Sequence, residues 1–291
     1  MKVPLLEFRL ALLTLAAMLA FAANSLLCRM ALQRTSIDPA SFTAVRLAAG
    51  ATVLALWAGS RKRAPERAGS WASAFALFVY AAAFSFAYVS LPTGTGALLL
   101  FGTVQVTMIG RGLWRGERLG TRQQLGLLVA LAGLVVLVWP GLATPPLEGA
   151  VLMIGAGIAW GVYSLRGAGS ADPLRATASN FLRAVPMSLA LSVLMIGRAT
   201  PDAVGLAWAV ASGALASGLG YAVWYTVLRQ LRSTSAATVQ LSVPVIAALG
   251  GVLWLGEPLN TRLVLASAAV LGGVAAVMHV RTPRRPSTDA P

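Results

Sequence analysis

The chain alternates between long apolar runs and short polar connections along almost its whole length. Each run is close to the roughly 20 residues that an α-helix needs to cross the hydrocarbon core of a bilayer. The connections are often three to eight residues long, which leaves no room for a soluble domain. The pattern therefore predicts ten membrane-spanning helices, over residues 8–31, 39–59, 71–90, 94–114, 121–140, 147–166, 174–197, 203–228, 233–255 and 261–279.

A sequence motif occurs once in each half of the chain. Residues 110–122 and 250–262 lie 140 positions apart and are identical at 8 of 13 positions. Each half therefore holds five spans, and because five is odd, the second half enters the membrane upside down relative to the first. We expect an all-α membrane protein of two inverted five-helix repeats, residues 1–143 and 144–280, followed by a cytoplasmic tail, 281–291.

Composition and charge agree with a membrane protein. The chain is 57% hydrophobic and only 11% charged, whereas about a quarter of the residues of a soluble domain are charged. The net charge of +14 is spread between the apolar runs, so no nucleic-acid partner is expected. Of the 23 Lys and Arg residues, 17 fall on the side of the N-terminus and four on the other, which predicts cytoplasmic termini.

Several kinds of chemistry lack the side chains they need. With one cysteine, Cys28, and one histidine, His279, neither an intrachain disulfide nor a Cys/His metal site can form, and no cofactor is expected. The chain has no Gly-x-x-x-x-Gly-Lys phosphate loop and no nucleophile–base pair, so we expect no enzymatic activity. All nine carboxylates fall at span ends, in connections or in the tail, and Glu7, close to the first span, is the only possible exception, which disfavours proton coupling through an embedded acid.

The motif residues resemble a known family. The Gly116-Glu117 and Gly256-Glu257 ends of spans four and nine, with the glycines of spans five and ten, are similar to those of EamA-type transporters of the drug/metabolite transporter superfamily. The resemblance covers roughly residues 8–280 and implies ten helices as five plus five. One departure is Pro244 in span nine, which stands where span four has Val104.

The resemblance also implies a function. It indicates a secondary transporter of the bacterial inner membrane that opens a central cavity to each side in turn. The lack of an acid in mid-membrane favours facilitative transport, and a monomer is the expected state. Within the superfamily the chain looks most like exporters of aromatic amino acids. The expected partners are therefore the lipid bilayer and a small-molecule cargo, an aromatic or otherwise bulky neutral amino acid that moves outward.

A site for such a cargo needs polar groups on an aromatic wall. Spans three, six and eight carry aromatic residues at helical spacing, and spans one, four and nine carry amides and a hydroxyl. The predicted substrate-binding residues are Asn24, Tyr80, Phe84, Tyr88, Gln105, Trp160, Tyr163, Tyr221, Trp224, Tyr225, Gln240 and Ser242. The alternative for each is an interfacial aromatic or a polar contact between helices.

Five further residues are predicted to act in gating or structure. Arg46 and Arg183 occupy matching places 137 positions apart and either bind a substrate anion or hold each half together, of which we favour the second. Glu117 and Glu257 are expected to cap helices or lock loops. Pro244 is expected to bend span nine, because proline removes a backbone hydrogen bond.

Three rival functions remain open at this stage. An exchanger of phosphorylated sugars or nucleotide sugars would need several basic residues in the interior of the spans, where only Arg46 and Arg183, and no lysine, lie away from the span ends. A membrane receptor or scaffold that transports nothing has no need of inverted repeats. A lipid-acting membrane enzyme would need an embedded acid or histidine.

Overall fold

The structure is a computed structural model that describes residues 3–60, 68–116, 118–141, 144–167, 170–228, 230 and 239–278. Its regular elements, over these ranges, are all helical. They are α1 (Val3–Arg34), α2 (Pro39–Gly59), α3 (Trp71–Tyr88), α4 (Thr93–Trp114), α5 (Thr121–Val138), α6 (Leu147–Gly167), α7 (Pro173–Leu194), η1 (Ile196–Arg198), α8 (Ala203–Ala211), η2 (Ser212–Leu219), α9 (Gly220–Leu228), α11 (Ser242–Leu255) and α12 (Thr261–Met278).

Each predicted span overlaps a helix, and α8, η2 and α9 together form one continuous run. Eight of the described helical segments are long and apolar enough to cross a membrane. The helix α7 is 22 residues long but is not among them, and α11, with 14 described residues, is a shorter apolar helix. The chain is therefore a multi-pass, all-helical membrane protein.

Polar caps mark where helices begin. The Asp38 carboxylate accepts a hydrogen bond from the Ser41 N–H at 2.9 Å, and Pro39 occupies the first turn of α2. The same Asp-Pro pair starts α7, where Asp172 accepts from the Arg175 N–H at 3.2 Å. Burial alone would raise the pKa of Asp38, but hydrogen bonds from the backbone N–H groups around it lower that pKa below its ordinary value.

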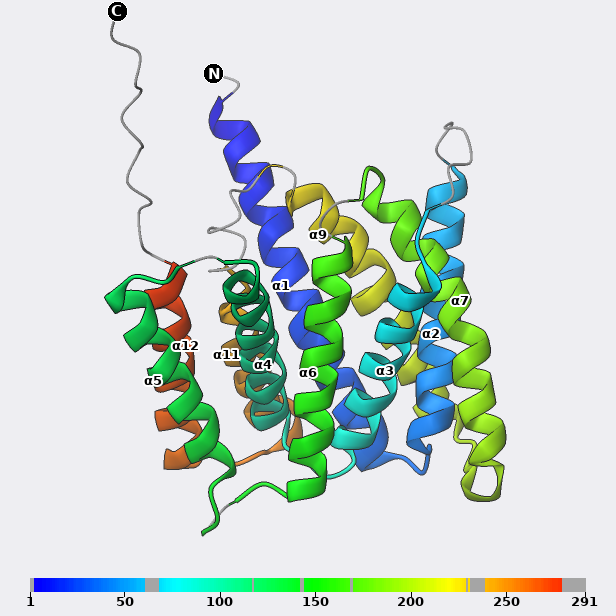
Figure 1. The fold of residues 1–291 in the computed structure, drawn as a ribbon. Coiled ribbons are helices and arrows are strands. Elements are labelled where there is room, and N and C mark those ends of the chain that lie inside the picture. Colours follow the sequence, from blue (N-terminus) through cyan, green and yellow to red (C-terminus); the bar gives the residue numbers. More distant parts are fainter. Residues whose placement is uncertain are drawn as a thin grey trace, which may run out of the picture.

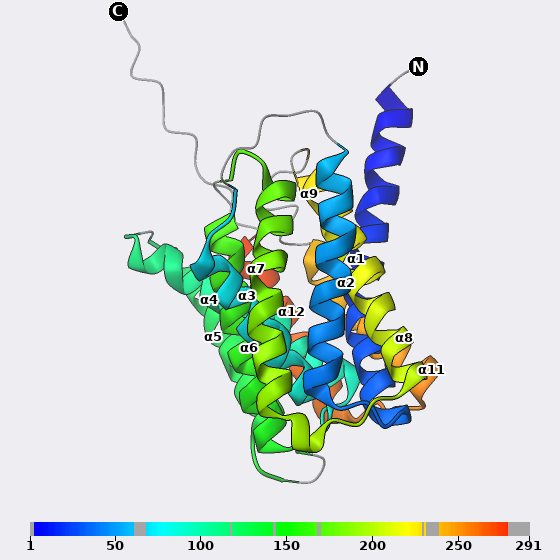
Figure 2. The same ribbon diagram turned by 90° about the vertical axis from the view of Figure 1, so that its right-hand side faces the viewer.

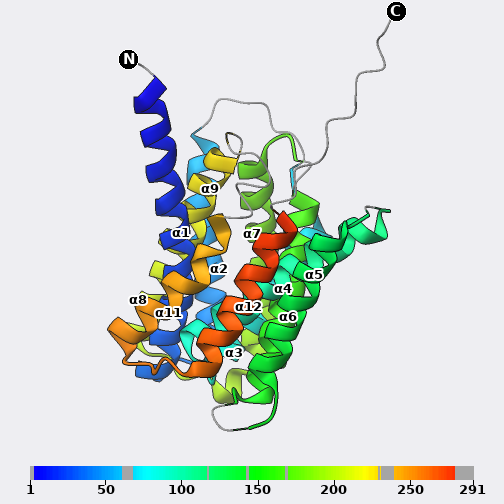
Figure 3. The ribbon, with the colours of Figure 1, turned by 90° about the vertical axis from the view of Figure 1, so that its left-hand side faces the viewer.

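The helices pack mainly across the two halves of the chain. Figure 1 shows α5 beside α12 at one side of the bundle and α2 beside α7 at the other, with α1, α4, α6 and α11 between them. Figure 2 shows α2 between α7 and α8, and Figure 3 shows α1 running beside α11. A central region is therefore bounded by helices from both halves.

Close helix packing depends on glycine where α5 crosses α12. A Cβ atom built on Gly126 would lie 2.6 Å from the Gly273 carbonyl oxygen, and one built on Gly273 would overlap the Gly126 carbonyl oxygen and lie 2.6 Å from the Ala130 nitrogen. These distances leave no room for a methyl group, so the backbones of the two helices touch directly. Gly272, the next residue, faces open space instead.

We expect Gly273→Ala to destabilise the protein and Gly272→Ala to leave it unchanged. The first change forces α5 and α12 apart, at about 1–3 kcal/mol for an overpacked contact. The second adds a methyl group in open space and removes a flexible glycine from a helix. Thermal unfolding of the purified protein in detergent measures both. Equal melting temperatures for the two variants would contradict the packing argument.

Candidate functional site

A small cavity lies in the middle of the bundle, between the two halves. Its volume is about 20 Å³, which is enough for about one water molecule. Its walls come from α1, α3 and α4 of the first half and from α6, η2 and α9 of the second. The lining residues are Phe21, Asn24, Ser25, Tyr80, Phe84, Leu100, Phe101, Trp160, Ala216 and Tyr221.

Aromatic rings make up one wall of the cavity, with Trp160 at their centre. The Trp160 ring lies 4.7 Å from the Tyr80 ring and 5.1 Å from the Tyr221 ring, measured between centroids. Tyr163 stacks on Trp160 at 5.4 Å with 30° between the planes. Phe84 continues the wall from Tyr80, at 5.5 Å. Rings arranged in this way can stack on the side chain of a bulky or aromatic cargo.

Polar groups meet at the phenol oxygen of Tyr80. This oxygen accepts hydrogen bonds from Asn24 Nδ2 at 3.3 Å and from Arg46 Nη2 at 3.1 Å. The Asn24 Oδ1 accepts in turn from the Ser212 hydroxyl at 2.7 Å. The Ser25 hydroxyl is buried and has no hydrogen-bond partner within the described ranges. The cavity thus has a polar side next to its aromatic wall.

The wall contributed by the second half contains an unusual helical segment. The segment η2 is a π-helix of eight residues that contributes Ala216 to the cavity wall and Ser212 as the hydrogen-bond donor to Asn24. A Cβ atom on Gly213 would overlap the Arg46 carbonyl oxygen, so α2 and η2 pack backbone to backbone. Widened π turns are frequent at functional sites. Here the turn brings polar and small residues against α1 and α2.

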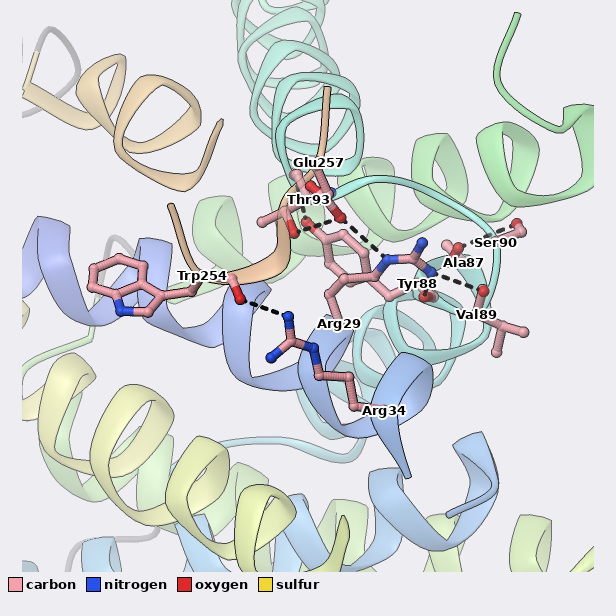
Figure 4. A network of polar contacts seen from close by, with 9 residues as sticks. All are labelled: Arg29, Arg34, Ala87, Tyr88, Val89, Ser90, Thr93, Trp254 and Glu257. Atoms are coloured by element: carbon pink, nitrogen blue, oxygen red, sulfur yellow. Dashed lines mark hydrogen bonds and ion pairs between the residues drawn. The ribbon is translucent and has the colours of Figure 1, made fainter. Parts of the chain in front are cut away.

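A second polar cluster lies at the end of the bundle opposite the start of α1 (Figure 4). Arg29 donates to Glu257 Oε1 at 3.3 Å and to the carbonyl oxygens of Tyr88 and Val89 at 2.8 and 2.9 Å (Figure 4). Glu257 Oε2 accepts from the Thr93 backbone N–H at 2.7 Å. The Arg29 and Glu257 side chains are only 11% and 10% exposed. We call this cluster the Arg29–Glu257 lock.

The backbone explains why a glycine precedes Glu257. Gly256 ends α11 with φ of 68°, a left-handed conformation that suits glycine, and the Glu257 N–H then bonds the Gly251 carbonyl. This turn aims the Glu257 carboxylate back toward Thr93 and Arg29. Gly116 has a similar φ of 88°, but Glu117 lies outside the described residues.

Arg183 sits in different surroundings from its counterpart Arg46. Its Nη1 donates to the Ala68 carbonyl at 3.4 Å, and its guanidinium lies 5.9 Å from the centre of the Trp71 ring. Half-buried, it joins α7, in the second half, to the segment before α3, in the first half, so this contact runs between the halves. Arg46, in contrast, is 2% exposed.

The remaining predicted site residues are spread more widely. Tyr88 is buried next to the lock, Trp224 packs on Phe21 at 5.8 Å, and Gln105 is buried in α4. At the start of α11, Gln240 is half-buried and the Ser242 hydroxyl donates to the Val239 carbonyl at 2.7 Å. The side chain of Tyr225 lies outside the described part.

Pro244 lies next to an interruption of the helical path in span nine, because residues 239–240 and α11 are helical and Leu241 between them is a turn. It falls in the first turn of α11, which begins at Ser242. Proline is well tolerated in a first turn, because the N–H groups there have no helical partner. The interruption lies where a bend of span nine is expected, and a role of Pro244 in gating stays a prediction.

Some residues of the site were not predicted. Phe21, Ser25, Leu100, Phe101 and Ala216 line the cavity, and Ser212 supports it. Arg29 is one of the four basic residues counted on the side opposite the N-terminus, yet Arg166 lies 137 positions after it, the same offset that relates Arg46 to Arg183. That shared offset is the signal that could have identified Arg29 as a repeated structural position.

Comparisons with known proteins agree with this architecture. The sequence profile of the EamA-like transporter family matches residues 9–139 and again residues 147–278. An uncharacterized protein of Pseudomonas aeruginosa is 57% identical over 95% of this chain and 96% of its own length. A crystal structure 21% identical in sequence superposes with a TM-score of 0.63 over 92% of this chain and 96% of that one, which shows the shared fold.

Two relatives have names that state a cargo. A probable terminal-alkyne amino-acid exporter of Streptantibioticus cattleyicolor is 26% identical over 70% of each chain. The threonine/homoserine exporter RhtA of Salmonella typhimurium is 30% identical over 43% of each chain.

Proposed function

We propose that this chain, which belongs to the EamA-like transporter family, exports bulky neutral or aromatic amino acids across the bacterial inner membrane. Membership of the family makes it a membrane transporter rather than an enzyme, and argues against a receptor or scaffold. The observation that carries the choice of cargo is the ring wall around Trp160, which stands next to the polar groups of Asn24 and Tyr80.

We further infer ten spans in two inverted repeats. In Figure 1, α1 and α6 run in opposite directions, as do α2 and α7, and α5 and α12. The packing repeats under exchange of the halves: α3 packs on α6 as α9 packs on α1, and α4 packs on α6 as α11 packs on α1. The two separate matches to the family profile support the same division.

Inverted halves supply a mechanism of alternating access. Two similar halves can exchange conformations, so that a site between them opens to one side and then to the other. The cavity of about 20 Å³ is too small for an amino acid, and the lock joins α1 to the turn that follows α11 at one end of the bundle. Cargo therefore enters only when the ring wall moves apart. One chain supplies the whole cavity, so a monomer is sufficient for transport. From the distribution of basic residues, we place both ends of the chain in the cytoplasm.

The rival cargo, a phosphate ester, fits the charges of the site less well. A phosphate dianion needs several basic groups. Two arginines are buried in the described part of the bundle, and one of them, Arg29, is paired with Glu257. That leaves Arg46 near the cavity, with a single charge. The described carboxylates lie at helix ends and in connections, which supports facilitative transport.

Flux through proteoliposomes tests the proposed function. Purified protein should take up labelled Phe, Trp and Met in a saturable manner, with Thr as a smaller cargo and a sugar phosphate as the rival. We expect flux of the bulky amino acids that does not change when a pH gradient is imposed. Flux of the sugar phosphate alone would overturn the cargo assignment.

A further inference from the structure

Arg46 is a buried cation in the middle of the protein. It lies eight residues into α2 and is 2% exposed. Its Nη2 donates to the Tyr80 hydroxyl, but Nε and Nη1 are buried and have no hydrogen-bond partner among the residues that the structure describes. An arginine keeps its charge in a protein, so these N–H groups stay strong donors that lack acceptors.

The charge of Arg46 is also without an opposite charge. The ion pairs found within the described ranges are Arg29–Glu257 and Arg175–Asp172, and neither includes Arg46. The rings of Phe84 and Tyr80 lie 4.8 and 5.3 Å from the guanidinium carbon, and their faces stabilise the cation only in part. A buried, unpaired charge is unfavourable unless an anion binds to it in the working protein.

The two rings that contact Arg46 also line the cavity. Tyr80 and Phe84 are both wall residues, and the Tyr80 oxygen joins the Arg46 guanidinium to Asn24. The ring wall must move before any cargo larger than water enters, because the cavity holds about one water molecule. A shift of these two rings would expose the donors of Arg46 to the cargo.

We infer that Arg46 binds the carboxylate of the cargo, while the ring wall around Trp160 takes its side chain. This deepens the proposed function and rests on it for the identity of the cargo as an amino acid. One guanidinium neutralises one carboxylate, and the charge-assisted hydrogen bonds that result are stronger than neutral ones. The transporter should therefore require a carboxylate on its ligand and tolerate the loss of the amine.

Three ligands with the same ring separate these requirements. L-Phenylalanine carries both groups, 3-phenylpropionate carries only the carboxylate, and phenethylamine carries only the amine. Binding to the purified full chain is followed by quenching of tryptophan fluorescence, and competition against labelled phenylalanine is followed in proteoliposomes. We expect 3-phenylpropionate to bind at least about tenfold more tightly than phenethylamine. Equal binding of the two would overturn the assignment of Arg46.

Variants of the arginine give a second test. Arg46→Met should remove the preference for 3-phenylpropionate, and Arg46→Lys should keep part of it, because lysine retains the charge without the planar fork. Arg183→Met is the matched control and should keep the full preference, since Arg183 contacts the Ala68 carbonyl away from the cavity. A folded Arg46→Met protein that still discriminates would refute the inference. If that variant does not fold, the wild-type comparison and Arg46→Lys decide.

The outcomes separate this inference from the proposed function. Amino-acid flux with no preference for a carboxylate would retain the function and reject the role of Arg46. Carboxylate binding that depends on Arg46, without flux of any amino acid, would retain the site and reject amino-acid export. Tighter binding of glycerol 3-phosphate than of 3-phenylpropionate would reject a carboxylate as the ligand group.

Discussion

Replacing Glu257 with Gln is expected to open the end of the bundle opposite the start of α1. The carboxylate accepts from Arg29 and from both the N–H and the hydroxyl of Thr93, and so joins α1, the start of α4 and the end of α11. Removing one partner of a nearly buried ion pair costs about 3–5 kcal/mol, because the other charge stays unpaired. The conformation closed at this end should therefore lose most of its free-energy advantage over the conformation open at this end.

The only cysteine of the chain reports on this opening. Cys28 is fully buried and precedes Arg29 in α1, so a maleimide reagent should label it slowly in the wild type. In Glu257→Gln we expect labelling to be at least about tenfold faster and transport to fall strongly, because the two ends no longer open in turn. Unchanged labelling would show that the lock does not seal this end.

Two further variants make the test specific. Glu148→Gln removes an exposed carboxylate at the same end of the bundle. It should change neither the rate of Cys28 labelling nor the rate of transport. Exchanging the charges, with Arg29→Glu and Glu257→Arg together, should not restore the lock. An arginine at 257 cannot accept from the Thr93 N–H, and a glutamate at 29 cannot donate to the Tyr88 carbonyl. Recovery in the exchanged protein would mean that the charge pair alone makes the seal.

Much of the fold could be predicted because each membrane helix corresponds to a long apolar run in the sequence. The predicted spans 39–59 and 147–166 agree with α2 and α6 to within a residue. The Asp38-Pro39 pair fixes one of these starts, since an acidic cap and a proline both favour a first turn. The beginning of the predicted span 233–255 lies outside the described residues, and the apolar pattern does not show the turn at Leu241 that precedes α11.

The candidate site was predictable in kind but not in its details. Aromatic residues spaced along α3 and α6 indicate a common face, and the structure brings Tyr80 and Trp160 together from that pattern. The 137-residue offset to Arg166 marks Arg29 as a repeated position, but no sequence pattern identifies its partner Glu257, which is 228 residues away. Long-range pairs of this kind depend on how helices cross, which periodicity does not specify.

Arg46 and Arg183 also show that sequence position alone does not specify which groups surround a side chain. Their matching positions in the two halves favoured one shared role in structure. The structure gives Arg183 a backbone carbonyl to bond, whereas Arg46 meets the rings of Tyr80 and Phe84 instead. A repeated position therefore does not imply a repeated environment, since the halves differ in the helices that face each arginine.

The second large effect is expected from Trp160→Ala. Trp160 contacts the rings of Tyr80, Tyr163 and Tyr221, and it forms the centre of the cavity wall. Each aromatic pair contributes about 0.5–1.5 kcal/mol beyond the area it buries. An aromatic cargo that takes the place of one of these rings loses its main stacking surface in the variant. We expect the KM for phenylalanine uptake to rise at least about tenfold, with a much smaller rise in Trp160→Phe.

The choice of control determines what this result means. Trp114 is 84% exposed at the end of α4, so Trp114→Ala removes the same side chain without touching the cavity and should leave the KM unchanged. Thermal unfolding of each variant shows whether the protein is still folded. A folded Trp160→Ala protein that transports phenylalanine with the wild-type KM would show that the cargo binds elsewhere. A rise in KM for phenylalanine but not for threonine would tie the ring wall to the size and aromatic character of the cargo, because threonine offers no ring to stack.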